Sequence, residues 1–386
     1  MLPANDLVKD FATSVDIREN SVYEILEFVI KNNIDITIPI SEKSLKTDIV
    51  EVFNENKIPI FGPNIDITET IFDKCFLKKI LYKLKIPTPK FGIFEKQNLA
   101  LDYIKNIRLP FVVKTNESSS AVILTSQNTI KPVIDSYFIN KEQKILIEDY
   151  IWGTPFSFYV LTDGYEAASL GSSIHYKHSL DGNGGQLTTG MGACAPNYKL
   201  SFEKENYIMT EIIYPLLNYF KAQGTPYLGI LGLDAILTDD NEILVLGLKT
   251  FMQDSDAVGI LELIDTDLIL LFRSCLLGYF SDEVASIPYK NLSTTSVVLT
   301  CKNKNNIENI INGIEDLDDD IVLTFYPQTK KNKYLEYEVD YGQSLIITGI
   351  GRTAYSATNK AYKNVSKINF KGIHYRKDIC LSTTHI

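Results

Sequence analysis

The sequence predicts an α/β protein with more than one domain. The chain has 386 residues, which exceeds the usual length of a single domain. Hydrophobic residues make up 45% of the chain and charged residues 22%, so there are enough apolar side chains for buried cores. The first part of the chain alternates strand and helix patterns with short connections, which is typical of a parallel sheet.

The N-terminal segment shows this alternation most clearly. Apolar residues recur with helical spacing in Ser21–Asn32, which predicts a helix with one apolar face. A second helix is predicted over Ser44–Asn56. The predicted strands of this segment are Ser14–Ile17, Asp35–Ile40 and Pro59–Phe61.

The middle of the chain is predicted to contain a lysine-rich helix, several strands and one glycine-rich loop. The helix covers Thr68–Leu84 and ends before the turn Ile86–Pro89. Two strands stand alone, and four others form two antiparallel pairs. In chain order these strands are Phe111–Lys114, Lys144–Tyr150, Phe156–Leu161, Ala167–Ser172, Leu231–Leu237 and Ile243–Leu248. The loop, rich in glycine and threonine, is Asp181–Pro196.

The C-terminal part, from about Thr294 to Ile386, is predicted to form a separate small domain. Val297–Thr300 and Leu345–Thr348 read as short strands, and Ala354–Asn364 reads as a helix. Together they predict a small α/β unit.

Charge and hydropathy narrow the class of protein. The net charge of −10 and the isoelectric point near 5.1 argue against a general binder of nucleic acid or anionic membrane. Arg273 interrupts the apolar stretch Leu268–Phe280, which therefore predicts a buried helix rather than a membrane span. We expect no signal peptide, because the N-terminus lacks a basic region followed by an apolar core. These features predict a soluble cytoplasmic protein.

The cysteines predict reduced thiols. There are five, an odd number, and none forms a CxxC motif: Cys75, Cys194, Cys275, Cys301 and Cys380. This pattern favours neither a disulfide framework nor a zinc site.

A series of short motifs occurs along the chain in a defined order. They are Ile60–Pro63, Asp73–Lys78 followed by Ile86-Pro87-Thr88, Val112-Val113-Lys114, Ile147–Tyr150, Thr188 with Gly190-Met191-Gly192, and Tyr375–Asp378. In this order and spacing the chain resembles the glycinamide ribonucleotide synthetase (phosphoribosylamine–glycine ligase) family of the ATP-grasp superfamily. The resemblance implies an α+β ATP-grasp fold with an N-terminal domain at 1–64, an ATP-grasp region at 65–290 and a C-terminal domain at 291–386. It also implies that the N-terminal parallel-sheet domain is truncated, without the family's first strand and helix.

The same resemblance implies a reaction. In the family, ATP phosphorylates the carboxylate of glycine, and the amine of phosphoribosylamine attacks the acyl phosphate. ATP and Mg2+ are therefore the implied cofactors, and the implied partners are small molecules, with neither nucleic acid nor membrane. The oligomeric state stays open. The alternative is a paralogue without catalysis that binds a nucleotide, a purine intermediate or a protein.

Site residues follow from the matched positions. Those implied for the nucleotide are two phosphate-binding lysines and three residues at the hinge that reads adenine: Lys74, Lys114, Glu148, Tyr150 and Ile151. Those implied for the acceptor substrate are Lys177, Thr188, Thr189, Gly190, Met191 and Gly192.

Several family positions carry unexpected residues. The two metal-ligand positions are matched by Leu246 and Leu248, with Thr250 on the same predicted face. Asp234 is then a weak metal candidate, with Asp254 as the alternative. We expect Lys249 to point the other way, into solvent.

Other matched positions also differ from the residues that the family carries there. His175 and His178 are expected to be exposed bystanders, and Pro155 stands where the family has an acidic residue for the ribose. The segment Thr115–Ser120 replaces the family's glycine-rich lid without any glycine. These departures predict that catalysis is reduced or lost.

Overall fold

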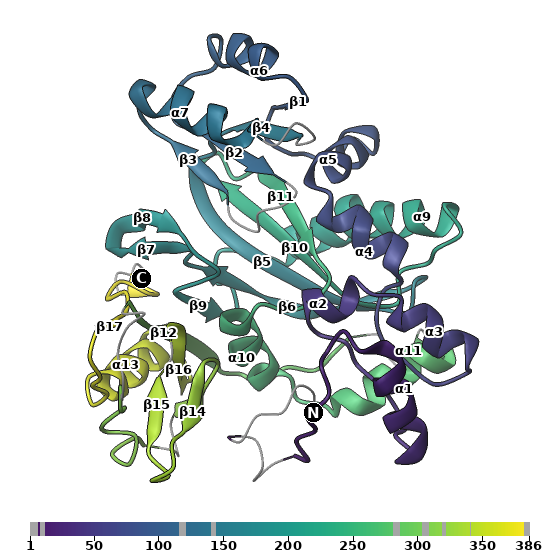
Figure 1. Ribbon diagram of the computed structural model, residues 1–386, viewed down its shortest axis with the longest axis vertical. Coiled ribbons are helices and arrows are strands. Elements are labelled where there is room, and N and C mark those ends of the chain that lie inside the picture. Colours follow the sequence, from purple (N-terminus) through teal and green to yellow (C-terminus); the bar gives the residue numbers. More distant parts are fainter. Residues whose placement is uncertain are drawn as a thin grey trace.

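Two main sheets, two small hairpins and a surrounding set of helices form the computed structural model in Figure 1. The structure describes Leu7 and residues 12–115, 121–139, 144–280, 286–302, 309–318, 322–339 and 341–381. A four-stranded sheet lies at the top of Figure 1, a long sheet crosses the centre, and the C-terminal part occupies the lower left. The N-terminal helices lie at the lower right.

The N-terminal segment is mainly helical. Its helices are α1 (Val22–Lys31), α2 (Glu42–Leu45) and α3 (Ile49–Glu55), so the first predicted helix is confirmed and the second is split in two. The predicted parallel sheet is reduced to one isolated parallel bridge between Thr37 and Ile60. The predicted strand Ser14–Ile17 is wrong, because it pairs with no other strand in the described part of the chain. Extended residues form a strand only when a neighbour supplies the ladder.

The predicted lysine-rich helix is also two helices. They are α4 (Ile65–Phe72) and α5 (Lys74–Lys83), with Asp73 between them in an extended conformation. The Asp73 carboxylate accepts a hydrogen bond of 2.8 Å from the Phe76 N–H group, so Asp73 is the N-cap of α5. This cap fixes where Lys74 begins the second helix.

The four-stranded sheet has the order β1-β4-β2-β3, and all its neighbours are antiparallel. Its strands are β1 (Phe91–Phe94), β4 (Ile145–Asp149), β2 (Phe111–Thr115) and β3 (Val122–Leu124). Helices α6 (Gln97–Ile104) and α7 (Gln127–Tyr137) share an apolar core with it. The predicted strands at β2 and β4 are confirmed.

The long sheet carries the two predicted antiparallel pairs, which are confirmed. Its order is β11-β10-β5-β6-β9-β12-β16-β13, with β17 beside β12. The strands are β5 (Gly153–Thr162), β6 (Ala167–His175), β9 (Gly192–Ala195), β10 (Gly229–Thr238), β11 (Ile243–Lys249), β12 (Ser293–Cys301), β13 (Val322–Phe325), β16 (Gly342–Gly351) and β17 (Ile373–His374). The sheet therefore continues from the central part of the chain into the C-terminal part through the β9–β12 pair.

Helices cover the central part of the long sheet on both of its faces. The largest apolar cluster joins α4 and α5 to strands β5, β10 and β11, to a π-helix at Ile208–Ile213 and to α9 (Tyr214–Ala222). The preceding helix α8 (Phe202–Tyr207) has no buried residue. A second cluster packs α10 (Asp254–Leu263) and α11 (Leu268–Leu277) against β5 and β6.

The C-terminal part has the predicted small α/β character. Helix α13 (Ala354–Val365) packs on β12 and β16, and the hairpin β14 (Thr329–Lys331) and β15 (Tyr337–Val339) lies beside them. Gly349 permits the close approach of α13, because a Cβ atom there would lie 2.2 Å from the carbonyl oxygen of Ala357. The domain bounds at 64 and 290 stay predictions.

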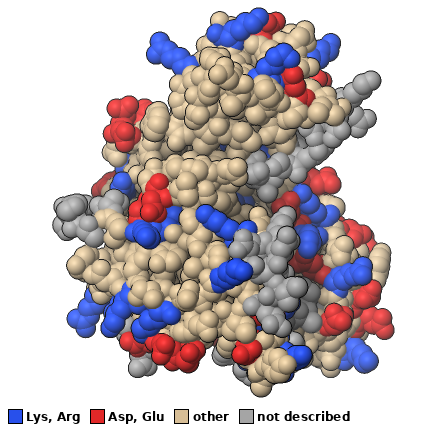
Figure 2. All heavy atoms as spheres, turned by 60° about the vertical axis from the view of Figure 1, so that its left-hand side comes forward, with Lys and Arg blue, Asp and Glu red and all other residues tan. Residues whose placement is uncertain are grey.

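Helix α11 is only partly buried, whereas the sequence predicted a buried helix over Leu268–Phe280. Leu271, Phe272 and Cys275 are buried, but Leu270 is 58% exposed, so the helix buries one face only. No helix among the described residues combines the length and apolar character needed to span a membrane. The face of the molecule drawn in Figure 2 carries basic and acidic residues interspersed with one another.

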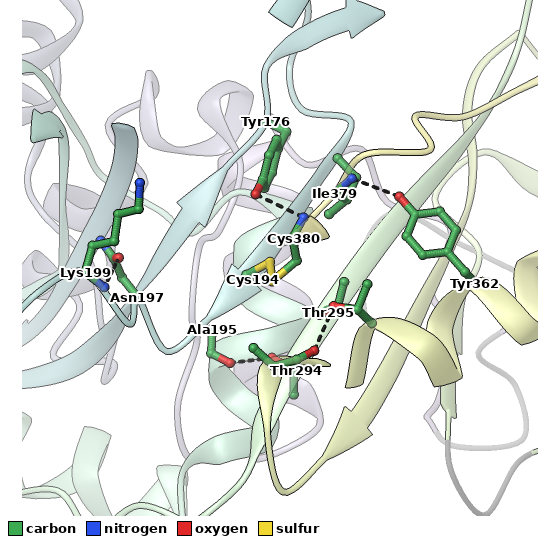
Figure 3. Close-up of a disulfide and its surroundings, with 12 residues drawn as sticks. Tyr176, Cys194, Ala195, Asn197, Lys199, Thr294, Thr295, Tyr362, Ile379 and Cys380 are labelled. Atoms are coloured by element: carbon green, nitrogen blue, oxygen red, sulfur yellow. Dashed lines mark hydrogen bonds between the residues drawn. A yellow bond between two sulfur atoms is a disulfide. The ribbon is translucent and has the colours of Figure 1, made fainter. Parts of the chain in front are cut away.

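The structure corrects the prediction of five reduced cysteines. Cys194 on β9 and Cys380 near the C-terminus form a disulfide, whereas Cys75, Cys275 and Cys301 are buried thiols outside any disulfide among the described residues. Figure 3 shows that the hydroxyl of Tyr176 accepts a hydrogen bond from the Cys380 N–H group beside it, at 3.0 Å. The two cysteines are 186 residues apart, and sequence spacing gives no signal that the fold brings them together.

Candidate functional site

A cavity of about 570 Å³ lies between the four-stranded sheet and the long sheet. Helix α5, strands β2, β4, β10 and β11, and the hairpin formed by β7 (His178–Leu180) and β8 (Gly184–Leu187) contribute its walls. Most of the residues predicted for a site line it, namely Lys74, Lys114, Glu148, Tyr150, Ile151, Lys177, Thr188, Thr189, Asp234, Leu246 and Leu248. The fold thus gathers residues that are far apart in the sequence.

One wall of the cavity contains a glutamate held by two lysines. The Glu148 side chain is only 2% exposed, and its two oxygens lie 2.6 Å from Lys78 Nζ and 2.5 Å from Lys114 Nζ. Burial acts to raise the pKa of Glu148, but the two ammonium groups outweigh it and lower the pKa. The carboxylate therefore stays ionised and fixes both lysines.

Helix α5 places its lysines on one face. Lys74 and Lys78 are four residues apart, so they project toward the same wall. Lys74 Nζ donates a hydrogen bond of 2.8 Å to the carbonyl of Thr115, and burial together with Lys114 lowers the pKa of Lys74 to about 8. Sequence reasoning missed Lys78, although its spacing from Lys74 was a usable signal.

The opposite wall contains a second charged group around Asp234. Lys177 Nζ lies 2.6 Å from Asp234 Oδ2, and His175 Nε2 lies 3.5 Å from Asp234 Oδ1. Burial raises the pKa of Asp234, but Lys177 and Lys249 outweigh this and hold it below its ordinary value. Asp234 is therefore an ionised partner of Lys177, not a solvated aspartate.

The expectation of exposed histidines is wrong. His175 is buried, its Nδ1 lies 3.0 Å from the Ser157 hydroxyl, and burial lowers its pKa to about 3. His175 is therefore neutral at pH 7. His178 is half-buried and also lines the cavity.

The expectation that Lys249 points into solvent is wrong, although Lys249 does lie on the face opposite Leu248 and Thr250. Leu248 is 9% exposed and packs in the large apolar cluster at the edge of the cavity, and Thr250 is buried away from the cavity lining. Gly247 pairs with Asp234, and Lys249 lies two residues further along, on the same face. A bulge opposite Asp234 and Ala235 takes Leu246 out of the alternation that Leu248 and Thr250 follow.

Lys249 therefore faces the cavity wall instead of open solvent. Its side chain is 11% exposed, and Nζ donates a hydrogen bond of 2.9 Å to the Ser157 hydroxyl. Asp256 Oδ2 lies 3.6 Å from the same nitrogen. Burial acts to lower the pKa of Lys249, but Tyr159 and the two aspartates raise it overall. The ammonium form persists at pH 7.

The predicted substrate loop divides between cavity and core. Thr188 and Thr189 line the cavity, and the Thr188 hydroxyl donates a hydrogen bond of 2.8 Å to the Lys177 carbonyl. Gly190, Met191 and Gly192 are absent from the lining; Met191 is buried, and Gly192 pairs with Val297 in the long sheet.

The lid and the ribose contact are two further features that the family resemblance implied. Residues 116–120 of the expected lid lie outside the described residues. Pro155, at the position implied for the ribose, lines the cavity.

The side chains here do not fit a divalent metal ion. Mg2+ takes oxygen ligands, yet Gly247 and Lys249 on the cavity face of β11 supply none. No group of three or more His, Cys, Asp or Glu side chains suited to a metal exists among the described residues.

A cavity between a small antiparallel sheet and a long sheet is the arrangement of an ATP-grasp protein. Comparison of the sequence with protein families agrees with this class. Residues 72–257 match the family described as phosphoribosylglycinamide synthetase, ATP-grasp (A) domain. Residues 1–69 match the N domain of the same synthetase, and residues 301–382 match its C domain. The chain therefore belongs to the phosphoribosylglycinamide synthetase family.

Individual relatives agree with the family. The chain is 27% identical to phosphoribosylamine–glycine ligase of Caldanaerobacter subterraneus subsp. tengcongensis, over 98% of this chain and 92% of that protein. It is 29% identical to the ligase of Clostridium acetobutylicum, over 92% of this chain and 86% of that protein. The structure of phosphoribosylamine–glycine ligase from Thermotoga maritima matches with a TM-score of 0.80 at 20% identity, covering 98% and 92% of the two chains. The predicted ATP-grasp fold is confirmed.

Proposed function

We propose that this protein is an ATP-dependent ligase that joins glycine to phosphoribosylamine in purine biosynthesis. Membership of the synthetase family and the names of the relatives support this reaction. The observation that supports placing this reaction in the cavity is that the residues expected for both ligands lie around one space. Residues expected for the nucleotide, such as Lys114, and for the acceptor substrate, such as Thr188, line the same space of about 570 Å³.

In the proposed reaction the γ-phosphoryl group of ATP moves to the glycine carboxylate, and the amine of phosphoribosylamine then displaces phosphate from the acyl phosphate. Lys74 and Lys114 are the proposed contacts of the ATP phosphates, since ammonium groups act as compact cations for phosphate. The backbone of Tyr150 and Ile151 is the proposed contact of adenine. Lys177 and Thr188 are proposed for the acceptor. All substrates are small molecules, and we propose the cytoplasm as the compartment.

A second candidate is nucleotide binding without efficient turnover. The observation that favours it is the cavity face of β11, where Gly247 and Lys249 provide no oxygen for the Mg2+ that family chemistry implies. Loss of one group that stabilises developing charge slows a reaction by roughly 10²–10³-fold. Reduced catalysis therefore stays a prediction that the side chains support.

The test is an ADP-release assay with ATP, glycine and phosphoribosylamine, run beside the Clostridium acetobutylicum relative. We expect ADP formation that requires both co-substrates, at a rate lower by about 10²-fold or more than that of the relative. Thermal unfolding is followed in parallel, because saturating ATP at roughly 100 times its dissociation constant should stabilise the fold by about 2.7 kcal/mol.

Two variants make the assay specific. Lys114→Met is expected to weaken the stabilisation by ATP, whereas Lys131→Ala, on the exposed face of α7, should behave as the wild type. Stabilisation by ATP without ADP release would favour the second candidate. Neither stabilisation nor release would contradict both.

A further inference from the structure

We infer that the Lys249 ammonium group is a built-in cation of this cavity, occupying the place where a divalent metal ion would otherwise neutralise Asp234 and Asp256. The cavity then binds the anionic groups of its ligand without a divalent ion at β10 and β11. This inference rests on the proposed nucleotide binding, and it departs from the family expectation of Mg2+ at this strand.

Two elements besides its own strand hold the Lys249 side chain in position. Ser157 and Tyr159 come from β5, Asp256 comes from α10, and Lys249 itself comes from the end of β11. Nζ lies 2.9 Å from the Ser157 hydroxyl, 3.5 Å from the Tyr159 hydroxyl and 3.6 Å from Asp256 Oδ2. A side chain that long is ordered only when several partners fix its end.

Gly232 on β10 creates the space that Lys249 uses. Gly232 pairs with Lys249 on one side and with Tyr159 on the other. A Cβ atom at Gly232 would lie 2.6 Å from the Tyr159 ring and 3.1 Å from Lys249 Cβ. The missing side chain therefore lets the lysine cross β10 and reach the groups on β5.

The charges around Lys249 already balance. Asp234 and Asp256 carry one negative charge each, and Lys249 carries one positive charge. Burial lowers the pKa of Lys177, but its contact with Asp234 at 2.6 Å favours the ammonium form, which supplies the second positive charge. His175 adds no charge at pH 7, because burial holds its pKa at about 3. A divalent ion added here would leave two uncompensated positive charges in a buried place, which is strongly unfavourable.

The carboxylate oxygens are also nearly all in use. Asp256 Oδ1 accepts from Ser173, and Asp256 Oδ2 accepts from Ser157 and Tyr159, at 2.8–2.9 Å. Asp234 Oδ2 accepts from Lys177. Of these four oxygens, only Asp234 Oδ1 has no hydrogen-bond partner among the described residues, and His175 Nε2 lies 3.5 Å from it. One such oxygen, on an aspartate already paired with Lys177, is a poor start for the octahedral oxygen shell of Mg2+.

The register also shows how a metal site could be restored. Gly247 lies opposite Asp234, and the space where its Cβ atom would stand is open, with no atom within 4 Å. The double variant Gly247→Glu, Lys249→Asn replaces the ammonium group by oxygen donors beside Asp234. It is expected to gain a divalent-cation site, whereas Lys249→Arg keeps the positive charge and should not.

The experiment has two readouts on the purified full chain. Mn2+ binding is titrated by electron paramagnetic resonance without nucleotide, and ADP binding is titrated calorimetrically in EDTA and in excess Mg2+. For the wild type and Lys249→Arg we expect no Mn2+ binding and ADP dissociation constants equal within about twofold in the two buffers. For the double variant we expect Mn2+ binding, and ADP binding weaker by about tenfold or more in EDTA than in Mg2+.

The outcomes separate the two proposals. Mn2+ binding by the wild type, or ADP binding by the wild type only in Mg2+, would overturn the inference. Absence of ADP binding in both buffers contradicts the proposed function, while the Mn2+ titration of the wild type still decides the inference. That titration also stands if the double variant does not fold, and Lys131→Ala is the control expected to match the wild type.

Discussion

At the scale of single residues, Glu148 is a side chain in the cavity wall that two lysines hold. It is buried and forms ion pairs with both Lys78 and Lys114, so three charged groups lie together in a site largely shielded from water. Lys78 also donates to the carbonyl of Val245 at 3.2 Å, which ties α5 to β11. Sequence comparison pointed to Glu148 as a reader of adenine, but its two oxygens already hold the lysines.

Removal of the Glu148 charge is expected to destabilise the fold. Glu148→Gln leaves two ammonium groups near each other without a carboxylate, and breaking a buried pair typically costs about 3–5 kcal/mol. The measurement is the free energy of unfolding in urea. As the control, Asp102→Asn removes an exposed ion pair with Lys105 and should cost less than about 1 kcal/mol. Equal effects of the two substitutions would contradict the assignment of Glu148.

At the scale of elements, the hairpin β7–β8 is attached to the C-terminal segment. Arg376 is buried and forms two hydrogen bonds with Asp378, at 2.7 and 2.6 Å. The same guanidinium group reaches the carbonyl of His178 at 3.2 Å and Asn183 Oδ1 at 3.0 Å. Because this hairpin is a wall of the cavity, Arg376 positions that wall from a distant part of the chain.

Arg376→Lys is therefore expected to loosen the hairpin. A lysine keeps the charge but cannot make the two parallel bonds to Asp378 while also reaching β7 and the Asn183 side chain. We expect faster amide hydrogen exchange in residues 178–187, by about tenfold or more, which corresponds to a local loss of about 1.4 kcal/mol. Arg352→Lys, at an exposed position, is the matched control. Unchanged exchange in the hairpin would argue against this anchoring role.

At the scale of the whole molecule, the disulfide joins strand β9 to the end of the described chain. Figure 3 shows Cys194 and Cys380 between Tyr176 and the segment that contains Tyr362. The Tyr362 hydroxyl accepts a hydrogen bond of 2.9 Å from the Ile379 N–H group. The backbone next to Cys380 is therefore held by a hydrogen bond as well as by the disulfide. The bond closes a loop of 186 residues.

Thiol counting tests this bond. Without reductant, the denatured wild type should present three reactive thiols, from Cys75, Cys275 and Cys301, and Cys194→Ser should present four. Reduction should lower the unfolding temperature, since closing a long loop is worth up to about 5 kcal/mol in the chain-entropy account. Five reactive thiols in the unreduced wild type would show that the two cysteines remain free.

The sequence by itself determined the family, the fold class and the strands β2, β4, β5, β6, β10, β11, β12 and β16, because these depend on local patterns and on the order of motifs along the chain. Most of the residues predicted for a site line one cavity, whereas Gly190, Met191 and Gly192 do not, and their roles stay predictions. The burial of Lys249 was decided only by the tertiary structure, since Ser157 and Tyr159 on β5 and Asp256 on α10 surround its ammonium group. The disulfide and the pairing of Glu148 with Lys78 likewise depend on contacts between distant segments, which local propensity does not encode.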